Sequence, residues 1–243
     1  MKIVATNTPA TREAFAAAVV RAWWHVLQTQ PTHDSILTLV AQSAFETGWW
    51  KKMWCNNPGN AKSLQRAGDW YFIRCTEYID PAHAEAMLSA AGKTVDGVPN
   101  VELGVFVNFA KPGAPPRMKR HVTLLPDHSG ACFRAFPTLD AGVLDHFSLV
   151  VGQYASAFEF LVRGDTYGFI KALGAATYYT DSFEHYFSTV DACKKMLKDL
   201  VVDLSPPPPA QVVPQFSLQN LTWSIIDEDL DRHGNESDSE ENS

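Results

Sequence analysis

One carboxylate, Glu46, stands where general acid chemistry would be expected, at the end of an apolar segment and among aromatic residues. Ile36, Leu39 and Val40 recur upstream at helical spacing, and Gly48 is the residue type expected just past a helix end. Burial beside aromatic rings raises the pKa of a carboxyl group, which would let it donate a proton near neutral pH. The alternative is an exposed last-turn glutamate followed by ordinary aromatic packing. The aromatic neighbours in the sequence are Phe45, Trp49, Trp50 and Trp54.

Four further segments of the chain combine polar and aromatic residues. A turn-forming stretch, N-N-P-G-N-A-K at 56–62, follows the aromatic cluster. The stretch R-C-T-E-Y at 74–78 ends a strand-like run, and F-R-A-F-P-T at 133–138 leads into a helix bearing Asp145 and His146. The last segment is A-A-T-Y-Y-T-D at 175–181. Glu77, in the second of these segments, is the candidate for a second carboxylate.

Taken with A-F-E-T-G-W at 44–49, these segments resemble the glucosaminidases of glycoside hydrolase family 73, which cleave peptidoglycan. That family has an A-x-x-E-S-G-W helix end, an N-x-F-G-I-K turn, a T-T-E-Y hairpin, an F-R-x-Y-x-S segment and an A-G-Y-A-T-D segment. The resemblance covers about residues 35–200. The turn at 57–62 keeps the Asn, Gly and Lys of the family pattern but lacks its aromatic residue and isoleucine.

The resemblance implies roles for individual residues. Glu46 takes the position of the catalytic acid, Glu77 that of a second carboxylate on a hairpin facing it, and Tyr178 that of a tyrosine in the sugar groove. Tyr179 is adjacent to Tyr178 and could point into the groove instead. The remaining candidates for contact with substrate are Trp49, Trp50, Asn57, Lys62, Trp70 and Tyr179, although packing is an ordinary role for each tryptophan.

The reaction implied is hydrolysis of the β-1,4 bond after N-acetylglucosamine, without a cofactor. Glu46 would protonate the leaving oxygen. Glu77 would either activate water or stabilise positive charge while the substrate's acetamido group attacks. A muramidase or a lytic transglycosylase on the same scaffold would share Glu46. An alternative of another class is an inactive protein that binds the wall or assists assembly.

The fold expected is α+β and mainly helical, which the resemblance specifies as a lysozyme-like domain with a small β lobe beside a sugar-binding groove. Apolar periodicity predicts helices over 12–28, 33–47, 139–151, 155–163, 166–173 and 182–200. Strand patterns are confined to 70–73, which leads into the Glu77 hairpin, and to 101–109 and 122–125. We interpret 80–130 as an insertion beside the groove. Its basic residues would meet peptide carboxylates or remain solvated: Arg117, Lys119, Arg120 and His121.

Charge and composition divide the chain at its end. Eight acidic residues and one basic residue follow position 226, so this tail carries the whole formal net charge of -7. The rest of the chain has equal numbers of basic and acidic residues, which argues against nucleic acid binding. A proline run at 206–209 cannot continue a helix. We therefore expect a catalytic domain over 1–204, a spacer with a short apolar segment over 205–226, and an acidic, disordered tail over 227–243. The apolar segment would dock back onto the domain or bind a protein partner.

Neither a membrane span nor the apolar core of a signal peptide is present in the sequence. The expectation is therefore synthesis in a cytoplasm and action on the bacterial cell wall, as a phage lysin, a virion component or a delivered effector. The only local group of residues with metal-capable atoms is His121, Asp127, His128 and Cys132. Because most such groups bind no metal, no metal site is expected. The four cysteines form no C-x-x-C pair. The sequence does not decide whether Cys55 and Cys75 form a disulfide.

Overall fold

The computed structural model describes residues 1–208, apart from 64–65, 67, 95, 111–114 and 180–181. The chain divides into a first unit, Met1–Val213, and a second, Pro214–Ser243. Everything below concerns the first unit. The expected tail at 227–243, and all but the first residues of the expected spacer at 205–226, lie outside the described residues.

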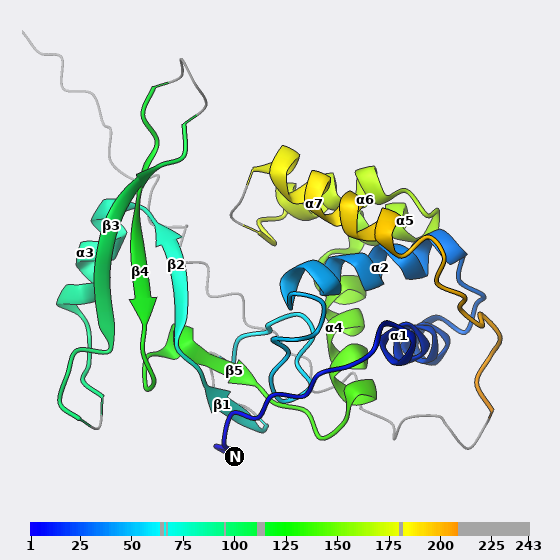
Figure 1. The fold of residues 1–243 in the computed structure, drawn as a ribbon, viewed down its shortest axis with the longest axis horizontal. Helices are drawn as coiled ribbons and strands as arrows, with labels where there is room; N and C mark the ends of the chain where they lie inside the picture. Colours follow the sequence, from blue (N-terminus) through cyan, green and yellow to red (C-terminus); the bar gives the residue numbers. More distant parts are fainter. Residues whose placement is uncertain (64–65, 67, 95, 111–114, 180–181, 209–243) are drawn as a thin grey trace, which may run out of the picture. The chain divides into compact units, whose positions relative to one another are not determined.

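The first unit is α+β and mainly helical, which confirms the fold class at that level (Figure 1). Within the described ranges the elements, in chain order, are α1 (Arg12–Leu27), α2 (His33–Glu46), β1 (Trp70–Phe72), β2 (Cys75–Ile79), α3 (Pro81–Ser89), β3 (Val101–Asn108), β4 (Met118–Leu124), a 3-10 turn (Ser129–Ala131), β5 (Cys132–Arg134), α4 (Leu139–Gln153), α5 (Ala155–Val162), α6 (Thr166–Ala175) and α7 (Phe183–Met196).

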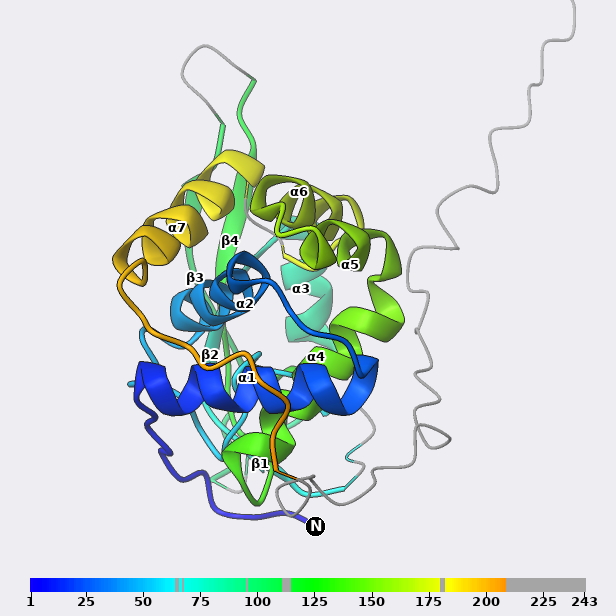
Figure 2. The same cartoon turned by 90° about the vertical axis from the view of Figure 1, so that its right-hand side faces the viewer.

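Helix α2 is the centre of the helical part. Its ten consecutive residues from Ser35 to Ala44 are all buried, so it is covered on every side rather than along one stripe. Helices α1, α5, α6 and α7 pack around it (Figures 1 and 2). Its polar residues hydrogen bond inside the core: the Ser35 hydroxyl donates to the Leu161 carbonyl at 2.6 Å, and Thr38 and Thr166 share a 2.7 Å bond. The helix therefore has little freedom to shift.

Side-chain caps explain why the helices begin where they do. The side-chain oxygens of Thr11, Thr32, Thr138 and Ser182 accept hydrogen bonds from backbone N–H groups in the first turns of α1, α2, α4 and α7. Each such cap contributes about 1 kcal/mol. The predicted starts at 12, 33 and 139 are confirmed, and α7 begins one residue later than predicted.

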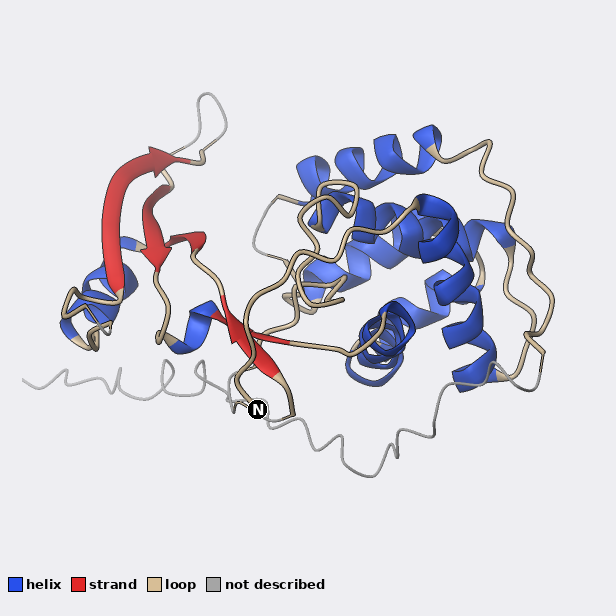
Figure 3. Ribbon diagram, turned by 60° about the horizontal axis from the view of Figure 1, so that its bottom comes forward, coloured by secondary structure: helices blue, strands red, loops and turns tan. Residues whose placement is uncertain are grey.

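The strands form two antiparallel sheets, shown in red in Figure 3. β1 pairs with β5, with Tyr71 opposite Phe133. The second sheet has the order β2-β4-β3, with Glu77 opposite Val122. The prediction that 70–73 leads into a hairpin with Glu77 is wrong, because β1 and β2 belong to different sheets and pair with strands from much later in the chain.

The segment 80–130, expected as an irregular insertion with two strands, contains one more element. α3 begins with Pro81 at its first position, where a missing N–H costs nothing, and it packs against β3 and β4. Ala84 of α3 joins Val101, Val122 and Leu124 in a small apolar cluster. The insertion is therefore a packed sheet-and-helix layer in the residues that the structure describes.

Candidate active site

Glu46 is the last residue of α2, and its carboxyl group is held from α7. The Tyr186 hydroxyl donates a hydrogen bond to Glu46 Oε1 at 2.7 Å. Tyr186 is only 2 % exposed, and its ring lies edge-on to Phe45 with the ring centroids 5.1 Å apart. The carboxyl group is therefore fixed by a residue 140 positions away in the sequence.

Burial raises the pKa of Glu46, and the hydrogen bond from Tyr186 offsets part of this rise. The direction agrees with the expectation from the aromatic neighbours, although the side chain that hydrogen bonds to the carboxyl group, Tyr186, comes from α7. Burial, followed by the charge of Glu46, raises the pKa of Tyr178 well above its usual range. Tyr178 is therefore a neutral phenol beside Glu46.

The chain turns sharply after Glu46. Gly48, Trp49 and Trp50 have φ of 56°, 60° and 58°, three successive residues in the left-handed region. This conformation costs a non-glycine residue about 1–2 kcal/mol. It is held by bonds from the Trp49 N–H to the Ala44 carbonyl at 2.7 Å and from the Trp50 N–H to the Thr47 hydroxyl at 3.0 Å. The turn directs Trp50 back into the core, where it stacks on Phe15.

The loop at 56–63 connects Glu46 with the β strands. The Asn60 side chain donates to the backbone carbonyl of Glu46 at 3.0 Å. Two residues later, Lys62 Nζ lies 3.4 Å from Glu77 Oε1 and donates to the Gly130 carbonyl at 2.6 Å. Lys62 also lies 4.1 Å above the Phe133 ring. The predicted residue Lys62 is thus a partner of Glu77.

Glu77 and Glu46 are not brought into contact. No hydrogen bond or ion pair joins their side chains among the residues described. Glu77 lies on β2 with its side chain 41 % exposed, and strand alternation places it on the same face as Cys75 and Ile79. Those two neighbours pack with Ala84 of α3. The negative charge of Glu77 is balanced by Lys62, with which it forms an ion pair.

Tyr178 and Tyr179 have distinct surroundings. Tyr178 lies beside Glu46 and edge-on to Tyr154, with ring centroids 5.2 Å apart. Tyr179 stacks on Tyr186 with the centroids 3.9 Å apart, and its hydroxyl donates to the Ile170 carbonyl at 3.0 Å. Tyr178 is therefore a second tyrosine that interacts electrostatically with Glu46, in addition to Tyr186, which is hydrogen bonded to it, and Tyr179 stacks on Tyr186.

Two of the predicted substrate contacts are structural. Trp50 is 2 % exposed and donates its indole N–H to Ser43 Oγ at 3.1 Å. Asn57 is 1 % exposed, and its amide nitrogen donates to the carbonyls of Ala61 and Arg134. A ligand has no access to either side chain, so we correct both assignments to packing roles.

The other two tryptophans predicted to contact substrate are half-buried. Trp49 packs against the helical core and lies edge-on to Trp50. Trp70 lies on β1 beside Phe72, with the Arg66 guanidinium 5.3 Å from its ring. Trp49 lies in the left-handed turn, three residues after Glu46 in the sequence. Trp70 belongs to strand β1, which pairs with β5.

Gln42 and Tyr186 are the site residues that the sequence analysis did not identify. Tyr186 falls within the apolar stripe of α7, a pattern that indicates core packing. The available signal was chemical: a tyrosine hydroxyl and a glutamine amide on otherwise apolar helix faces each need a hydrogen-bond partner when buried.

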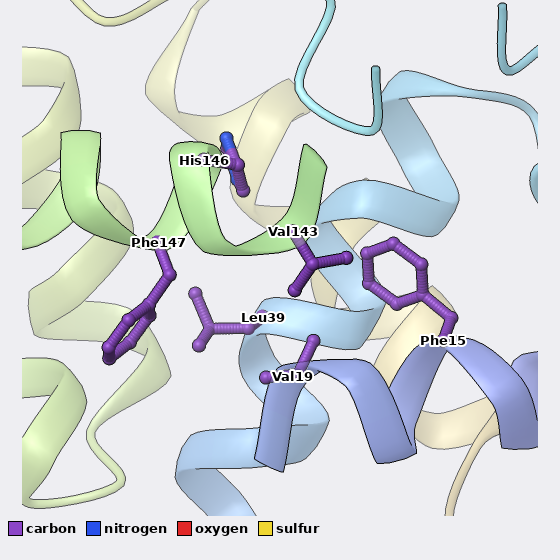
Figure 4. Close-up of a pocket in the computed structure, with 6 residues that line it drawn as sticks. All are labelled: Phe15, Val19, Leu39, Val143, His146 and Phe147. Atoms are coloured by element: carbon purple, nitrogen blue, oxygen red, sulfur yellow. The ribbon is translucent and has the colours of Figure 1, made fainter. Parts of the chain in front are cut away.

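His146 belongs to α4, and its ring packs directly against Gly59 of the loop at 56–63. It is 5 % exposed and borders a cavity of about 10 Å³ lined also by Phe15, Val19, Leu39, Val143 and Phe147 (Figure 4). Neither ring nitrogen has a hydrogen-bond partner among the described residues, and burial lowers its pKa to about 4. Neither Glu46 nor Glu77 lines this cavity.

The other chemistry-bearing residues lie apart. Within the ranges described, no three His, Cys, Asp or Glu side chains gather as a metal site would require. The thiols of Cys55 and Cys75 are free. None of the helices in that part of the chain has both the length and the apolarity that a bilayer span demands.

Comparisons with known proteins do not assign this chain to a family. No known protein family, characterised protein or solved structure matches this chain. The assignment of the site therefore depends on the geometry around Glu46 and on the sequence motifs.

Proposed function

We propose that this protein is a glycoside hydrolase of lysozyme-like architecture that cleaves the β-1,4 bond after N-acetylglucosamine in peptidoglycan, with Glu46 as the general acid. One observation carries the proposal: a carboxyl group at the end of a rigid central helix has its pKa raised by burial and one oxygen held by Tyr186. A general acid for glycoside cleavage needs such a group. The resemblance of the five sequence segments to family 73 supports the choice of substrate.

In the proposed reaction Glu46 transfers its proton to the glycosidic oxygen. The bond from that oxygen to the sugar carbon breaks, its electron pair stays on the leaving oxygen, and positive charge develops on the sugar ring. Water then supplies a hydroxyl group to the sugar carbon and a proton that restores the carboxyl group. In this proposal Tyr178, whose raised pKa keeps it a neutral phenol, would donate a hydrogen bond to the substrate.

Glu77 is the second carboxylate of the proposal, activating water or stabilising the charged ring. Its ion pair with Lys62, with 3.4 Å between Lys62 Nζ and Glu77 Oε1, ties the carboxylate to the loop at 56–63. The same pairing, together with the lack of contact with Glu46, favours a second candidate function, a lytic transglycosylase. In that reaction a hydroxyl group of the substrate attacks, so no carboxylate has to activate water.

The test is digestion of purified peptidoglycan, followed by borohydride reduction and mass analysis of the new ends. Reduced glucosamine ends support the proposal, reduced muramic ends indicate a muramidase, and anhydro ends indicate the transglycosylase. No new ends from the wild-type protein would overturn both candidates and favour a wall-binding or assembly role.

Glu46→Gln tests the residue behind the chemistry. We expect release of new ends to fall by at least about 100-fold, the usual contribution of a positioned general acid. Glu159→Gln, which removes an exposed carboxylate from α5, is the matched control and should retain full activity. Full activity in Glu46→Gln would remove Glu46 from the mechanism.

A further inference from the structure

Glu46 is the end of a short chain of hydrogen bonds in the core. Tyr186 donates to Glu46 Oε1 at 2.7 Å, and Gln42 Nε2 donates to the Tyr186 oxygen at 3.4 Å. A phenol has a single hydrogen. Because that hydrogen goes to Glu46, Tyr186 can meet Gln42 only as an acceptor, so Gln42 must present its NH₂ group. The direction of both bonds is fixed.

This arrangement has a local cost. Gln42 is fully buried, and its Oε1 has no hydrogen-bond partner among the described residues. A buried carbonyl oxygen without a hydrogen-bond partner is destabilising, whereas leucine would fill the same helix position without this cost. Gln42 lies one helical turn before Glu46 on α2, so the two side chains share a face. A costly polar residue beside a candidate acid indicates a functional constraint.

The Tyr186 ring is clamped. Tyr179 stacks on it with the centroids 3.9 Å apart and the planes 4° apart, and Phe45 meets it edge-on at 5.1 Å. Its hydroxyl is therefore held at one place relative to α2, as a catalytic constellation requires of its supporting residues.

We infer that Gln42 and Tyr186 are positioning residues that keep Glu46 Oε1 as a permanent hydrogen-bond acceptor, so that the transferable proton resides on Oε2. This inference rests on the proposed role of Glu46 as the acid. During transfer the Oε2–H bond breaks, the hydrogen bonds to the glycosidic oxygen, and that oxygen's bond to the sugar carbon breaks. Glu46 is left as a carboxylate that the Tyr186 hydrogen bond stabilises, since such bonds are stronger to charged acceptors.

Among the residues described, two phenols, those of Tyr186 and Tyr178, interact with Glu46. Tyr178 follows α6 and lies beside the carboxyl group, and Tyr154 lies behind Tyr178 at the junction of α4 and α5. Burial raises the pKa of both.

Tyr186→Phe tests the inference, with Tyr71→Phe as the matched control. Tyr71 is 1 % exposed and donates its hydroxyl to the Trp54 carbonyl at 3.2 Å, so the control also loses a buried hydrogen bond but lies next to β5. The Glu46 carboxyl carbon is followed by ¹³C NMR from pH 3 to 9, with Glu46→Gln identifying the signal.

We expect the pKa of Glu46 to rise in Tyr186→Phe, because a hydrogen bond to the carboxylate is lost, and to stay unchanged in Tyr71→Phe. In wall digestion, kcat should fall by about 10–100-fold with KM nearly constant, and the alkaline limb of the pH profile should move upward, as for loss of a residue that orients a reacting group. Gln42→Leu should shift the same limb less. An unchanged Glu46 pKa in Tyr186→Phe, or an equal change in Tyr71→Phe, would overturn the inference.

The two proposals fail separately. The NMR titration needs no substrate, so a positioning role at Glu46 is tested even if the wild-type protein releases no new ends. Conversely, wall digestion that is lost in Glu46→Gln but unaffected in Tyr186→Phe would leave the proposed function intact and remove the positioning role.

Discussion

Glu46 links the proposed activity to stability at the scale of one residue. Burial raises its pKa in the folded protein, so the folded state favours the protonated form. Its contribution to stability is therefore fully present below the pKa of the unfolded chain and is lost as pH rises through the folded pKa. A buried carboxyl group with a raised pKa is thus a source of instability at higher pH.

Glu46→Gln should consequently be more stable than the wild type at pH 8, and this advantage should shrink at pH 4.5. Glutamine keeps an oxygen that can accept the Tyr186 hydrogen but carries no charge. Urea unfolding of both proteins at the two pH values measures the difference. Glu159→Gln should show no such dependence, and an advantage of Glu46→Gln that grows toward acid pH would contradict the raised pKa.

Glu77→Gln separates the two candidate reactions. If Glu77 is the second carboxylate, as proposed, release of new ends should fall by about 100-fold. Glu102→Gln is the matched control, because Glu102 lies on β3 of the same sheet and pairs with Arg74 at 3.3 Å. Activity of Glu77→Gln within twofold of the control, with anhydro ends in the product, would favour the transglycosylase.

The sequence singled out Glu46 as the candidate acid but not the residues that hold its carboxyl group. Glu46 could be singled out because its neighbours in the chain are aromatic and a glycine follows. Tyr186 reaches it from 140 positions away, and no local pattern distinguishes this tyrosine from the core residues of α7. Trp50 and Asn57 resembled substrate contacts by type, but tertiary packing buried both.

At the scale of elements, the left-handed turn after α2 orients the residues around Glu46. Gly48→Ala should destabilise the protein by about 1–2 kcal/mol, since φ at Gly48 is 56° and a Cβ there meets no atom within 4 Å, which leaves backbone strain as the cost. Gly152→Ala is the control, because Gly152 lies in α4 and a Cβ there also meets nothing. It should stabilise by about 0.5–1 kcal/mol. Urea unfolding compares them; equal effects would refute the turn's strain.

Helix α4 carries an acid-sensitive group in His146. Its folded pKa of about 4 lies below that of an ordinary histidine, so the stability it permits is present above about pH 6.5 and is lost as pH falls toward 4. Wild-type protein should lose about 2 kcal/mol more than His146→Leu between pH 7.5 and pH 5. Urea unfolding at both pH values checks this.

The control for that experiment is His83→Gln, which replaces an exposed histidine of α3. It should follow the wild type at both pH values. A wild-type protein whose loss between the two pH values equals that of His146→Leu would show that His146 is solvated rather than buried.

The elements differ in how far the sequence could predict them. Helices with a cap and a wide apolar face, such as α1 and α2, begin where predicted because both signals are local. α3 buries only Ala84, so it lacked an apolar stripe, and only Asp80-Pro81 marked its start. The pairing of β1 with β5 joins residues about 60 positions apart, which strand periodicity does not encode.

At the scale of the whole first unit, one loop connects the two candidate carboxylates. Through 56–63 the chain runs from the end of α2 to the β strands, and Asn60 holds the carbonyl of Glu46 while Lys62 holds the side chain of Glu77. Asn57 fastens this loop to itself and to Arg134 of β5. The loop therefore contacts the backbone of Glu46 at one end and the carboxylate of Glu77 at the other.

The end of the described chain completes the helical core. Leu200 is 3 % exposed, Val202 and Leu204 pack against the same cluster, and the Trp24 indole N–H donates to the Leu204 carbonyl at 2.9 Å. A chain that ends at Asp199 should be less stable than one that ends at Pro208 by about 3 kcal/mol or more, because it exposes this apolar surface and leaves the Trp24 N–H unpaired.

Urea unfolding of the two truncated chains measures that difference. Leu200→Ala in the longer chain should account for much of it, about 2 kcal/mol or more. Val201→Ala is the control, since Val201 is 92 % exposed and should unfold like the parent. If the two truncated chains unfolded alike, residues 200–208 would be a surface attachment and the helical core would be complete at α7. Their stabilising role instead predicts that wall digestion by the shorter chain is lost at a lower temperature, because the same residues hold α1 and the buried α2 that carries Glu46.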